Sequence, residues 1–299
     1  MAGARLRPAS GSRVRASGAA RGERPANGRR SGAVAPDAAR GTAASAARHE
    51  LGGEQVEGRR AVLELLAAGR RQVREVWIAE GLDPAPQLDE IERWCARRHV
   101  RVAAVSRRQL QAAARTDAPQ GVLAYAEPLE PVDLDDLCRA GPDGPPLLLV
   151  LDGVTDPHNV GAMLRSAACA GVTGVVLPRH RAVHVTAAVA KVAAGAVEHL
   201  DVAVVAGVPA ALSHLAGHGV VPVGLDAGAG TSLYELGDEL RGPVALVLGS
   251  EGRGLGQLTR RRCAVLASIP QPGPLPSLNV ATAAAIASFE VVRRRLAPT

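Results

Sequence analysis

Apolar residues in the second half of the chain fall into short continuous runs and do not alternate with polar residues. Such runs are typical of parallel strands that are buried on both faces of a sheet. Helical segments separate most of the runs, so the pattern predicts an α/β domain with a mainly parallel sheet covered by helices on both faces. The predicted strands cover residues 147–151, 172–177, 202–205, 220–225, 244–248 and 265–269. The last predicted helix runs from about residue 278 to 296, with Ser277 at its N-cap.

A smaller alternating pattern precedes this domain. Apolar positions at helical spacing predict a helix through Val62 to Leu66, and further segments predict strands and helices in alternation. The predicted strands are 73–79, 100–105 and 122–126, and the predicted helices are 88–98 and a segment that opens at Ser106. We therefore expect a small α/β domain over residues 54–128, followed by a Pro- and Gly-rich linker over 129–146.

The first 50 residues differ in composition from the rest of the chain. They hold ten arginines and three acidic residues, a balance of +7, whereas the whole chain of 299 residues carries +6. Because such a segment buries too little apolar surface to offset its ordering entropy, we expect residues 1–50 to be a disordered basic tail. A mobile polycation gains affinity for nucleic-acid phosphates by releasing counterions. A merely solubilising extension and an organelle-targeting segment are the alternatives.

Composition also limits the class of protein. The chain is 47% hydrophobic, which is ample for globular cores, and no apolar stretch is long enough for a membrane span or a signal peptide. We therefore expect a cytoplasmic protein. The four cysteines lie far apart and form no Cys-x-x-Cys pair, which predicts reduced core residues and no zinc site. His180 and His184 have the spacing of a helical metal pair but no third ligand, so we predict no metal.

Three polar motifs carry the candidate chemistry. They are residues 156–167, residues 248–255, and residues 269–270 with 277–281. Each follows a predicted strand, and open α/β sheets bind ligands beyond the carboxyl ends of their strands. The motifs are therefore expected to meet in one cleft. Their candidate site residues are Asn159, Arg165, Glu251, Ser277 and Asn279.

Each motif also has a purely structural interpretation. Arg165 lies six residues after Asn159, about 9 Å along a helix, and helical side chains lean back toward the N-terminus, so its guanidinium could approach Asn159. It could equally extend to solvent. Glu251 among its glycines disfavours a phosphate-binding loop and could pair with Arg165 or with a ligand hydroxyl, or the segment could be only a tight turn. Ser277 and Asn279 could be a helix cap and a solvated amide.

Together the three motifs resemble the SpoU (TrmH/RlmB) family of RNA ribose 2′-O-methyltransferases, over about residues 54–299 and most strongly over 147–290. The resemblance implies a trefoil-knotted domain over residues 147–299 and S-adenosylmethionine as the methyl donor. The donor would be held by backbone groups at Gly249, Ile269 and Leu278. The residues that match the family's catalytic or ribose-positioning residues are Asn159, Arg165, Glu251, Ser277 and Asn279.

The resemblance also implies partners. The chain is most similar to the RlmB branch, which carries an RNA substrate-binding domain at residues 54–128 and methylates a guanosine of 23S ribosomal RNA. Family members are homodimers that pair through the last helix, here with Val280, Ala284, Ile286 and Ala287 on its apolar face. A transfer-RNA enzyme, a thiostrepton-resistance-type enzyme and a non-catalytic RNA-binding protein that kept the fold are the alternatives. Only five aromatic residues occur, so a base-stacking platform is disfavoured.

Overall fold

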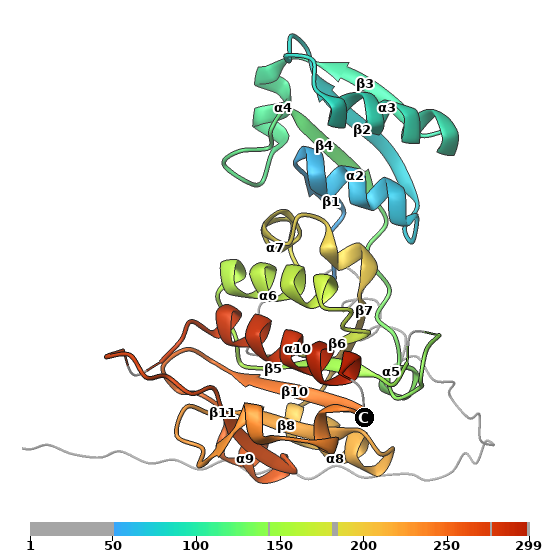
Figure 1. The fold of residues 1–299 in the computed structure, drawn as a ribbon. Helices are drawn as coiled ribbons and strands as arrows, with labels where there is room; N and C mark the ends of the chain where they lie inside the picture. Colours follow the sequence, from blue (N-terminus) through green and yellow to red (C-terminus); the bar gives the residue numbers. More distant parts are fainter. Residues whose placement is uncertain (1–50, 143, 181–184, 276, 298–299) are drawn as a thin grey trace, which may run out of the picture. The chain divides into compact units, whose positions relative to one another are not determined.

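The structure is a computed structural model that describes residues 51–142, 144–180, 185–275 and 277–297. The predicted basic tail lies outside the described residues, as does His184. The described elements form two sheets (Figure 1), one of four strands and one of seven. No helix among the described residues is long and apolar enough to cross a membrane.

The four-stranded sheet belongs to the first part of the chain. Its order is β1-β4-β2-β3, in which β2 and β3 are parallel while β4 runs antiparallel to β1 and β2. The elements are β1 (Gln55–Glu57), α2 (Arg59–Ala68), β2 (Val73–Ala79), α3 (Pro86–Arg98), β3 (Arg101–Val105), α4 (Arg107–Ala113) and β4 (Val122–Ala126). The predicted α/β pattern is confirmed, and β1 is an addition. Its residues Gln55 and Glu57 are polar yet buried, so no apolar signal marks this strand.

The seven-stranded sheet has the order β7-β6-β5-β10-β8-β11-β9, and every pair in it is parallel. Its strands are β5 (Leu147–Asp152), β6 (Gly174–Pro178), β7 (Asp201–Val205), β8 (Val221–Leu225), β9 (Thr231–Ser232), β10 (Val244–Gly249) and β11 (Val265–Ser268). All six strands predicted from apolar runs are present. The short polar β9 was not predicted.

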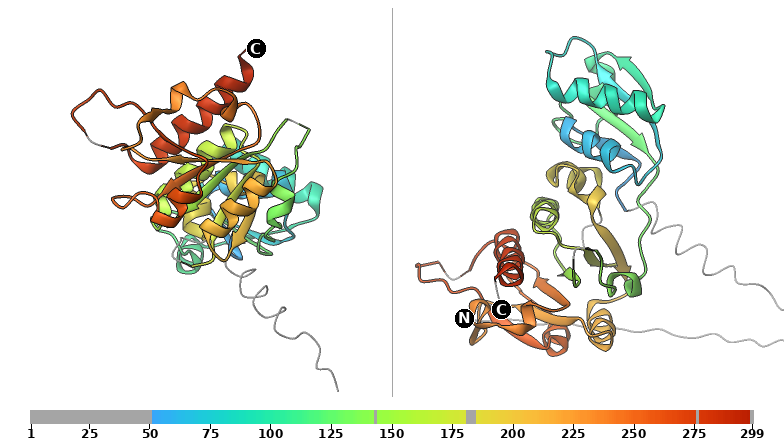
Figure 2. Two further views of the ribbon diagram at one scale, coloured as in Figure 1. Left: turned by 90° about the horizontal axis from the view of Figure 1, so that it is seen from below. Right: turned by 45° about the vertical axis from the view of Figure 1, so that its right-hand side comes forward.

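Helices cover both faces of this sheet, as predicted (Figure 1; Figure 2). Leu147, Leu149 and Leu151 of β5 pack in one apolar core with α6 and α10, while Leu148 and Val150 pack in a second core with α8. The helical elements are α5 (Leu134–Leu137), α6 (Pro157–Cys169), α7 (Ala187–Val192), α8 (Val208–Gly217), α9 (Gln257–Arg262) and α10 (Val280–Leu296), with 3-10 turns at Ala196–His199, Leu233–Glu235 and Asp238–Leu240.

The start of the last helix differs from the sequence prediction, and the start of α6 is likewise capped by a side chain. Ser277 is not the N-cap of the last helix; Asn279 is, because its side-chain oxygen accepts hydrogen bonds from the backbone of Ala281 and Thr282. Helix α6 begins at Pro157, with Asp156 as its N-cap. Both caps place the first turn of a helix next to a strand end of the seven-stranded sheet, and this is where the polar motifs lie.

Candidate active site

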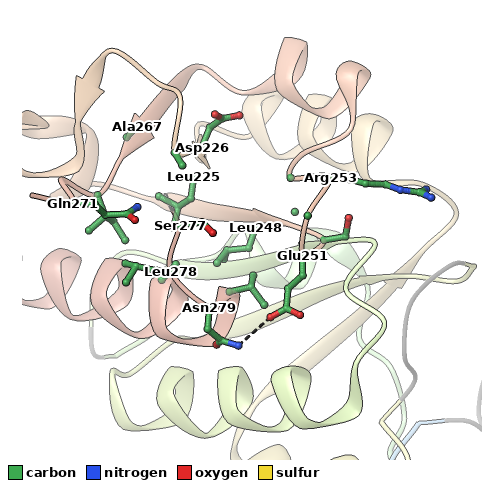
Figure 3. Close-up of a pocket in the computed structure, with 18 of the residues that line it drawn as sticks. Leu225, Asp226, Leu248, Glu251, Arg253, Ala267, Gln271, Ser277, Leu278 and Asn279 are labelled. Carbon is green, nitrogen blue, oxygen red and sulfur yellow. Dashed lines mark hydrogen bonds between the residues drawn. The ribbon is translucent and has the colours of Figure 1, made fainter. Parts of the chain in front are cut away.

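A cavity of about 510 Å³ opens beyond the carboxyl ends of β8, β10 and β11. Its walls come from the second and third motifs and from the turn after β8 (Figure 3). The lining includes Leu225, Asp226, Leu248, Gly249, Ser250, Glu251, Gly252, Arg253, Ile269, Gln271, Ser277, Leu278 and Asn279. We call this cavity the donor pocket. It contains all three residues predicted to hold the donor, Gly249, Ile269 and Leu278.

The loop after β10 folds back on itself at the edge of the donor pocket. A Cβ atom on Gly249 would overlap the backbone of Gly254 and Leu255, so only glycine fits there. Ser250 and Gly254 form an isolated bridge, in which the Gly254 amide donates to the Ser250 carbonyl at 2.8 Å. The Gly256 amide donates to Asp152 Oδ2 at 2.9 Å, which ties the loop to β5. The glycines therefore serve close backbone approach in a turn, and they leave polypeptide backbone facing the pocket.

Asn159, Glu251 and Asn279, one from each motif, are joined in a single hydrogen-bond network. Glu251 Oε1 accepts from Asn159 Nδ2 at 2.9 Å and from Asn279 Nδ2 at 3.0 Å. Asn279 Nδ2 also donates to Asn159 Oδ1 at 2.8 Å. Asn159 Nδ2 donates further to Asp156 Oδ2 at 2.9 Å. The expected convergence of the motifs is thus present for these three side chains.

Arg165 does not join this network. Glu251 is bonded to the two amides, so its suggested pairing with Arg165 is wrong. The Arg165 side chain is exposed and lines a second cavity of about 510 Å³, together with His158 and Lys191. Six residues along a helix amount to about 240° of rotation, which turns Arg165 away from the side where Asn159 lies.

The remaining predicted residue, Ser277, is exposed and lines the donor pocket beside Leu278. Asn279, and not Ser277, caps α10, so Asn279 has two functions. The Asn279 oxygen caps α10, and its nitrogen bonds to Glu251 and Asn159. The cap fixes the side-chain amide in one orientation, because each of its ends has defined partners.

The cysteines supply no nucleophile to the donor pocket. All four are free, and burial raises the pKa of Cys95 and of Cys263 to about 11, which keeps both as thiols at neutral pH. The prediction that all four are core residues is wrong for Cys169, which is exposed.

Potential metal ligands gather elsewhere. Within the described part of the chain, one group of His, Cys, Asp or Glu side chains is close enough to share an ion: Asp135, His214 and His218, all exposed. The two histidines lie four residues apart on and just after α8, a spacing that could have been noted in the sequence, whereas Asp135 joins them only through the fold. None of the three lines the donor pocket.

Comparison with known proteins agrees with these observations. The profile of the SpoU rRNA Methylase family matches residues 146–289, and that of the RNA 2′-O ribose methyltransferase substrate-binding domain matches residues 55–132. A 23S rRNA (guanosine-2′-O-)-methyltransferase RlmB from Xylella fastidiosa is 44% identical over 243 residues, which are 80% of this chain and 96% of the relative. The chain belongs to the SpoU family of RNA methyltransferases.

Further relatives share most of the chain. The RlmB enzyme of Pseudomonas syringae pv. tomato is 37% identical over 247 residues, covering 82% of this chain and 97% of that protein. Among solved structures, an RNA 2′-O ribose methyltransferase superimposes with a TM-score of 0.68 at 28% identity, covering 81% of this chain and 89% of the other. An AdoMet-bound rRNA methyltransferase from Sinorhizobium meliloti has a TM-score of 0.66 at 26% identity, with 81% and 88% covered. The fold and the AdoMet-dependent RNA methyltransferase class are therefore shared.

Proposed function

We propose that this SpoU-family enzyme transfers a methyl group from S-adenosylmethionine to the ribose 2′-hydroxyl of a guanosine in 23S ribosomal RNA. The observation that supports this most is the union of Asn159, Glu251 and Asn279 at the donor pocket, because three distant motifs supply one side chain each. The RlmB relatives, which match over nearly their full length, support the choice of RNA.

The donor pocket fits S-adenosylmethionine. Gly249 lets the loop after β10 fold tightly against itself at the edge of the pocket, and Ile269 and Leu278 line the pocket as apolar walls. When bound, the donor supplies an electrophilic methyl group on a sulfonium. The pocket carries Asp226 and Glu251 against Arg253 and Arg260, so it has no excess of positive charge, and this disfavours a polyphosphate as its ligand.

The reaction joins the ribose O2′ to the methyl carbon as the carbon–sulfur bond breaks, which leaves the donor as a neutral thioether, and the hydroxyl proton passes to solvent. We propose that Asn159, Glu251, Ser277 and Asn279 orient the ribose. Fixing two reactants in line removes much of the entropic cost of their encounter. We propose that Arg165 binds the phosphate of the target nucleotide and does not act as the general base, because a guanidinium stays protonated.

We propose the following organisation for the whole chain. Residues 54–128 bind the RNA substrate, 129–146 connect, and 147–299 form the methyltransferase domain; residues 1–50, the predicted basic tail, lie outside the described residues. The trefoil knot stays a prediction, as does a cytoplasmic location. In the connecting segment, α5 packs Leu137 into the second core of the sheet, which supports a fixed connection.

We also propose a homodimer, with a revised contact surface on α10. Two of the residues expected at the dimer interface, Ala284 and Ala287, are 1% and 0% exposed because they pack in the protein's own core. Phe289 and Leu296 are instead 48% and 79% exposed on this helix. They lie seven residues apart and therefore share one face of α10, and contiguous exposed apolar surface marks protein interfaces.

The decisive experiment offers tritium-labelled S-adenosylmethionine to the purified protein with unmodified 23S ribosomal RNA or unmodified transfer RNA, and maps every 2′-O-methyl position. Transfer to a guanosine ribose of 23S RNA is the expected result. Transfer to transfer RNA alone would replace the proposed substrate. Donor binding with no transfer to either RNA would favour a non-catalytic RNA-binding protein.

A further inference from the structure

The second cavity is lined by an excess of positive charge. Arg60, Arg115, Arg165 and Lys191 line it against two carboxylates, Glu57 and Asp117, and His158 adds a titratable ring. We call this cavity the basic pocket. Its volume of about 510 Å³ lies within the range of ligand-binding sites and is suited to a group about the size of a nucleotide.

Glu57, one of the two carboxylates, is held by the protein's own hydrogen-bond donors. Glu57 is fully buried and accepts hydrogen bonds from Gln55 Nε2 at 2.7 Å, from the Arg115 amide at 2.6 Å, and from the amide and hydroxyl of Thr116. It is therefore engaged in holding the loop after α4. This loop presents the Arg115 side chain to the pocket.

Arg60 is paired with Glu64 at 2.9 Å, but the other three cations keep donors free for a ligand. Across the described ranges, neither Arg115 nor Arg165 has a side-chain hydrogen bond or ion pair, and a guanidinium offers five N–H donors. Lys191 Nζ donates one hydrogen bond to Thr116 Oγ1 at 3.1 Å, and its two other N–H groups remain available to a ligand. Donors in this number and arrangement suit the oxygens of a phosphate diester.

The walls of the basic pocket are fixed in relation to each other. Arg71, which lies just before β2, forms a two-point ion pair with Glu198, at 2.6 Å and 3.1 Å, and both side chains are only 1% exposed. Removing one partner of such a pair leaves a buried unpaired charge at high cost. The Gly52 amide also donates to the Val185 carbonyl at 2.6 Å. The substrate-binding sheet is thus bonded to the segment that carries α7, and α7 carries Lys191.

Helix α6 connects the basic pocket to the donor network. His158, Gly161 and Arg165 share one face of α6, and this face packs on α7, since a Cβ atom on Gly161 would lie 2.6 Å from Val192 Cβ. Asn159 lies on another face and bonds to Asn279 at the start of α10. Helix α6 therefore lies between α7 and α10 (Figure 1; Figure 2). One helix serves both sites.

We propose that the basic pocket binds the phosphate backbone of a nucleotide next to the methylated one, with Arg115 and Lys191 as phosphate-positioning residues beside Arg165. This inference rests on the proposed function, because only an RNA substrate brings a chain of phosphates to α6. The contacts are with backbone and not with bases, so they set the register of the RNA and contribute no sequence preference.

The test compares Arg115→Gln and Lys191→Gln with Arg139→Gln, a control that removes one exposed charge lining neither pocket. Affinity for unmodified 23S ribosomal RNA is measured over a series of KCl concentrations, together with KM and kcat for RNA and Kd for S-adenosylmethionine. Each pocket variant should bind RNA roughly 5- to 10-fold more weakly at low salt. The slope of log affinity against log KCl concentration should be smaller in magnitude by about 0.7. KM should rise more than kcat falls, and donor affinity should stay unchanged.

The outcomes separate the two proposals. Arg115→Gln leaves the backbone bond to Glu57 in place, so its melting temperature should match that of the wild type and its RNA affinity can be interpreted directly. If both pocket variants match Arg139→Gln in affinity and slope while the wild type methylates RNA, the basic pocket has been wrongly assigned. If the wild type methylates no RNA, the proposed function itself fails, and the salt slopes still report whether the pocket binds phosphates.

Discussion

Asn279 and Asn159, 120 positions apart in the sequence, are joined by a hydrogen bond of 2.8 Å from the Nδ2 of the first to the Oδ1 of the second. The bond connects the first turn of α10 to the first turn of α6, and both nitrogens also reach Glu251. Amide nitrogens donate and carboxylate oxygens accept, so each contact has a defined direction. The network fixes three side chains at once, which is what in-line transfer between two bound substrates requires.

Asn279→Ser separates the two functions of Asn279. Serine is about as good an N-cap as asparagine, so α10 and the melting temperature should be nearly unchanged. The amide donor to Glu251 and Asn159 is lost, and methyl transfer should fall at least about 10-fold through misplacement of the site. Asn279→Ala loses the cap as well and should cost about 1 kcal/mol of stability. Turnover assays and thermal unfolding measure both; full activity in Asn279→Ser would exclude the network from function.

Arg165→Ala should lower turnover at least about 100-fold, while donor affinity stays within about twofold of the wild type. The reason is positional: Arg165 lines the basic pocket and not the donor pocket. Its side chain is exposed and unbonded within the described residues, so the fold should be unaffected. Arg165→Lys keeps the charge but cannot bind a phosphate through two parallel hydrogen bonds, so its turnover should lie between those of the wild type and Arg165→Ala. Isothermal titration measures the affinity for S-adenosylmethionine, and turnover assays measure methyl transfer. Retained turnover in Arg165→Ala would exclude Arg165 from the mechanism.

The sequence predicted the sheet well because its signal is local. A strand such as β5 is buried on both faces, and an unbroken apolar run is the direct consequence. By contrast, β1 is buried through Gln55 and Glu57, whose polar groups are satisfied by the end of α4 and the loop after it, more than 50 residues away. No local pattern reports such long-range satisfaction.

The candidate site shows the same division. That Asn159, Glu251 and Asn279 meet followed from their positions after parallel strands, whose carboxyl ends share an edge. The position of Arg165 did not follow, because it depends on which face of α6 packs on α7, and Gly161 decides this by its close contact with Val192. The cap at Asn279 was likewise decided by geometry, since Ser277 is an equally good N-cap by residue type.

Gly249→Ala should disrupt the donor pocket more than any other glycine substitution in its loop. The added Cβ would overlap the backbone of Gly254, which cannot move aside as a flexible side chain could, so we expect a cost of about 3 kcal/mol or more and loss of donor binding. Gly252→Ala is the matched control: it meets no atom but has a φ of 77°, which predicts a cost of about 1 kcal/mol. Denaturant unfolding and donor titration compare them, and equal effects would contradict the close-approach argument.

Phe289→Asp should convert the protein to a monomer. Phe289 is 48% exposed on α10, and a charge at the centre of an apolar interface typically removes 2 kcal/mol or more of binding, about a 30-fold rise in the dimer Kd. Leu258→Asp on α9 is the control, since Leu258 is 63% exposed on a different helix and should leave the assembly unchanged. Sedimentation velocity distinguishes the two. A wild type that is monomeric at all concentrations would refute the dimer, and a Phe289→Asp dimer would place its interface elsewhere.

Glu290→Gln should lower stability in a pH-dependent way. Hydrogen bonds from Arg293 and then Arg294 hold the pKa of Glu290 below its usual value of 4.5, against the opposing effect of burial. A carboxyl whose pKa is lowered in the folded state stabilises the fold above the unfolded-state value, and the contribution disappears as the pH falls through the folded-state pKa. The wild type should therefore melt roughly 2–4 °C above Glu290→Gln at pH 7, and the gap should close as the pH falls below about 4.5. Glu92→Gln is the control, because Glu92 is exposed and has no ion pair among the described residues, and its melting temperature should match that of the wild type at pH 7. If the melting temperatures of the wild type and Glu290→Gln differ as much at pH 3 as at pH 7, the shape of the Glu290 side chain, and not its charge, stabilises the last turns of α10.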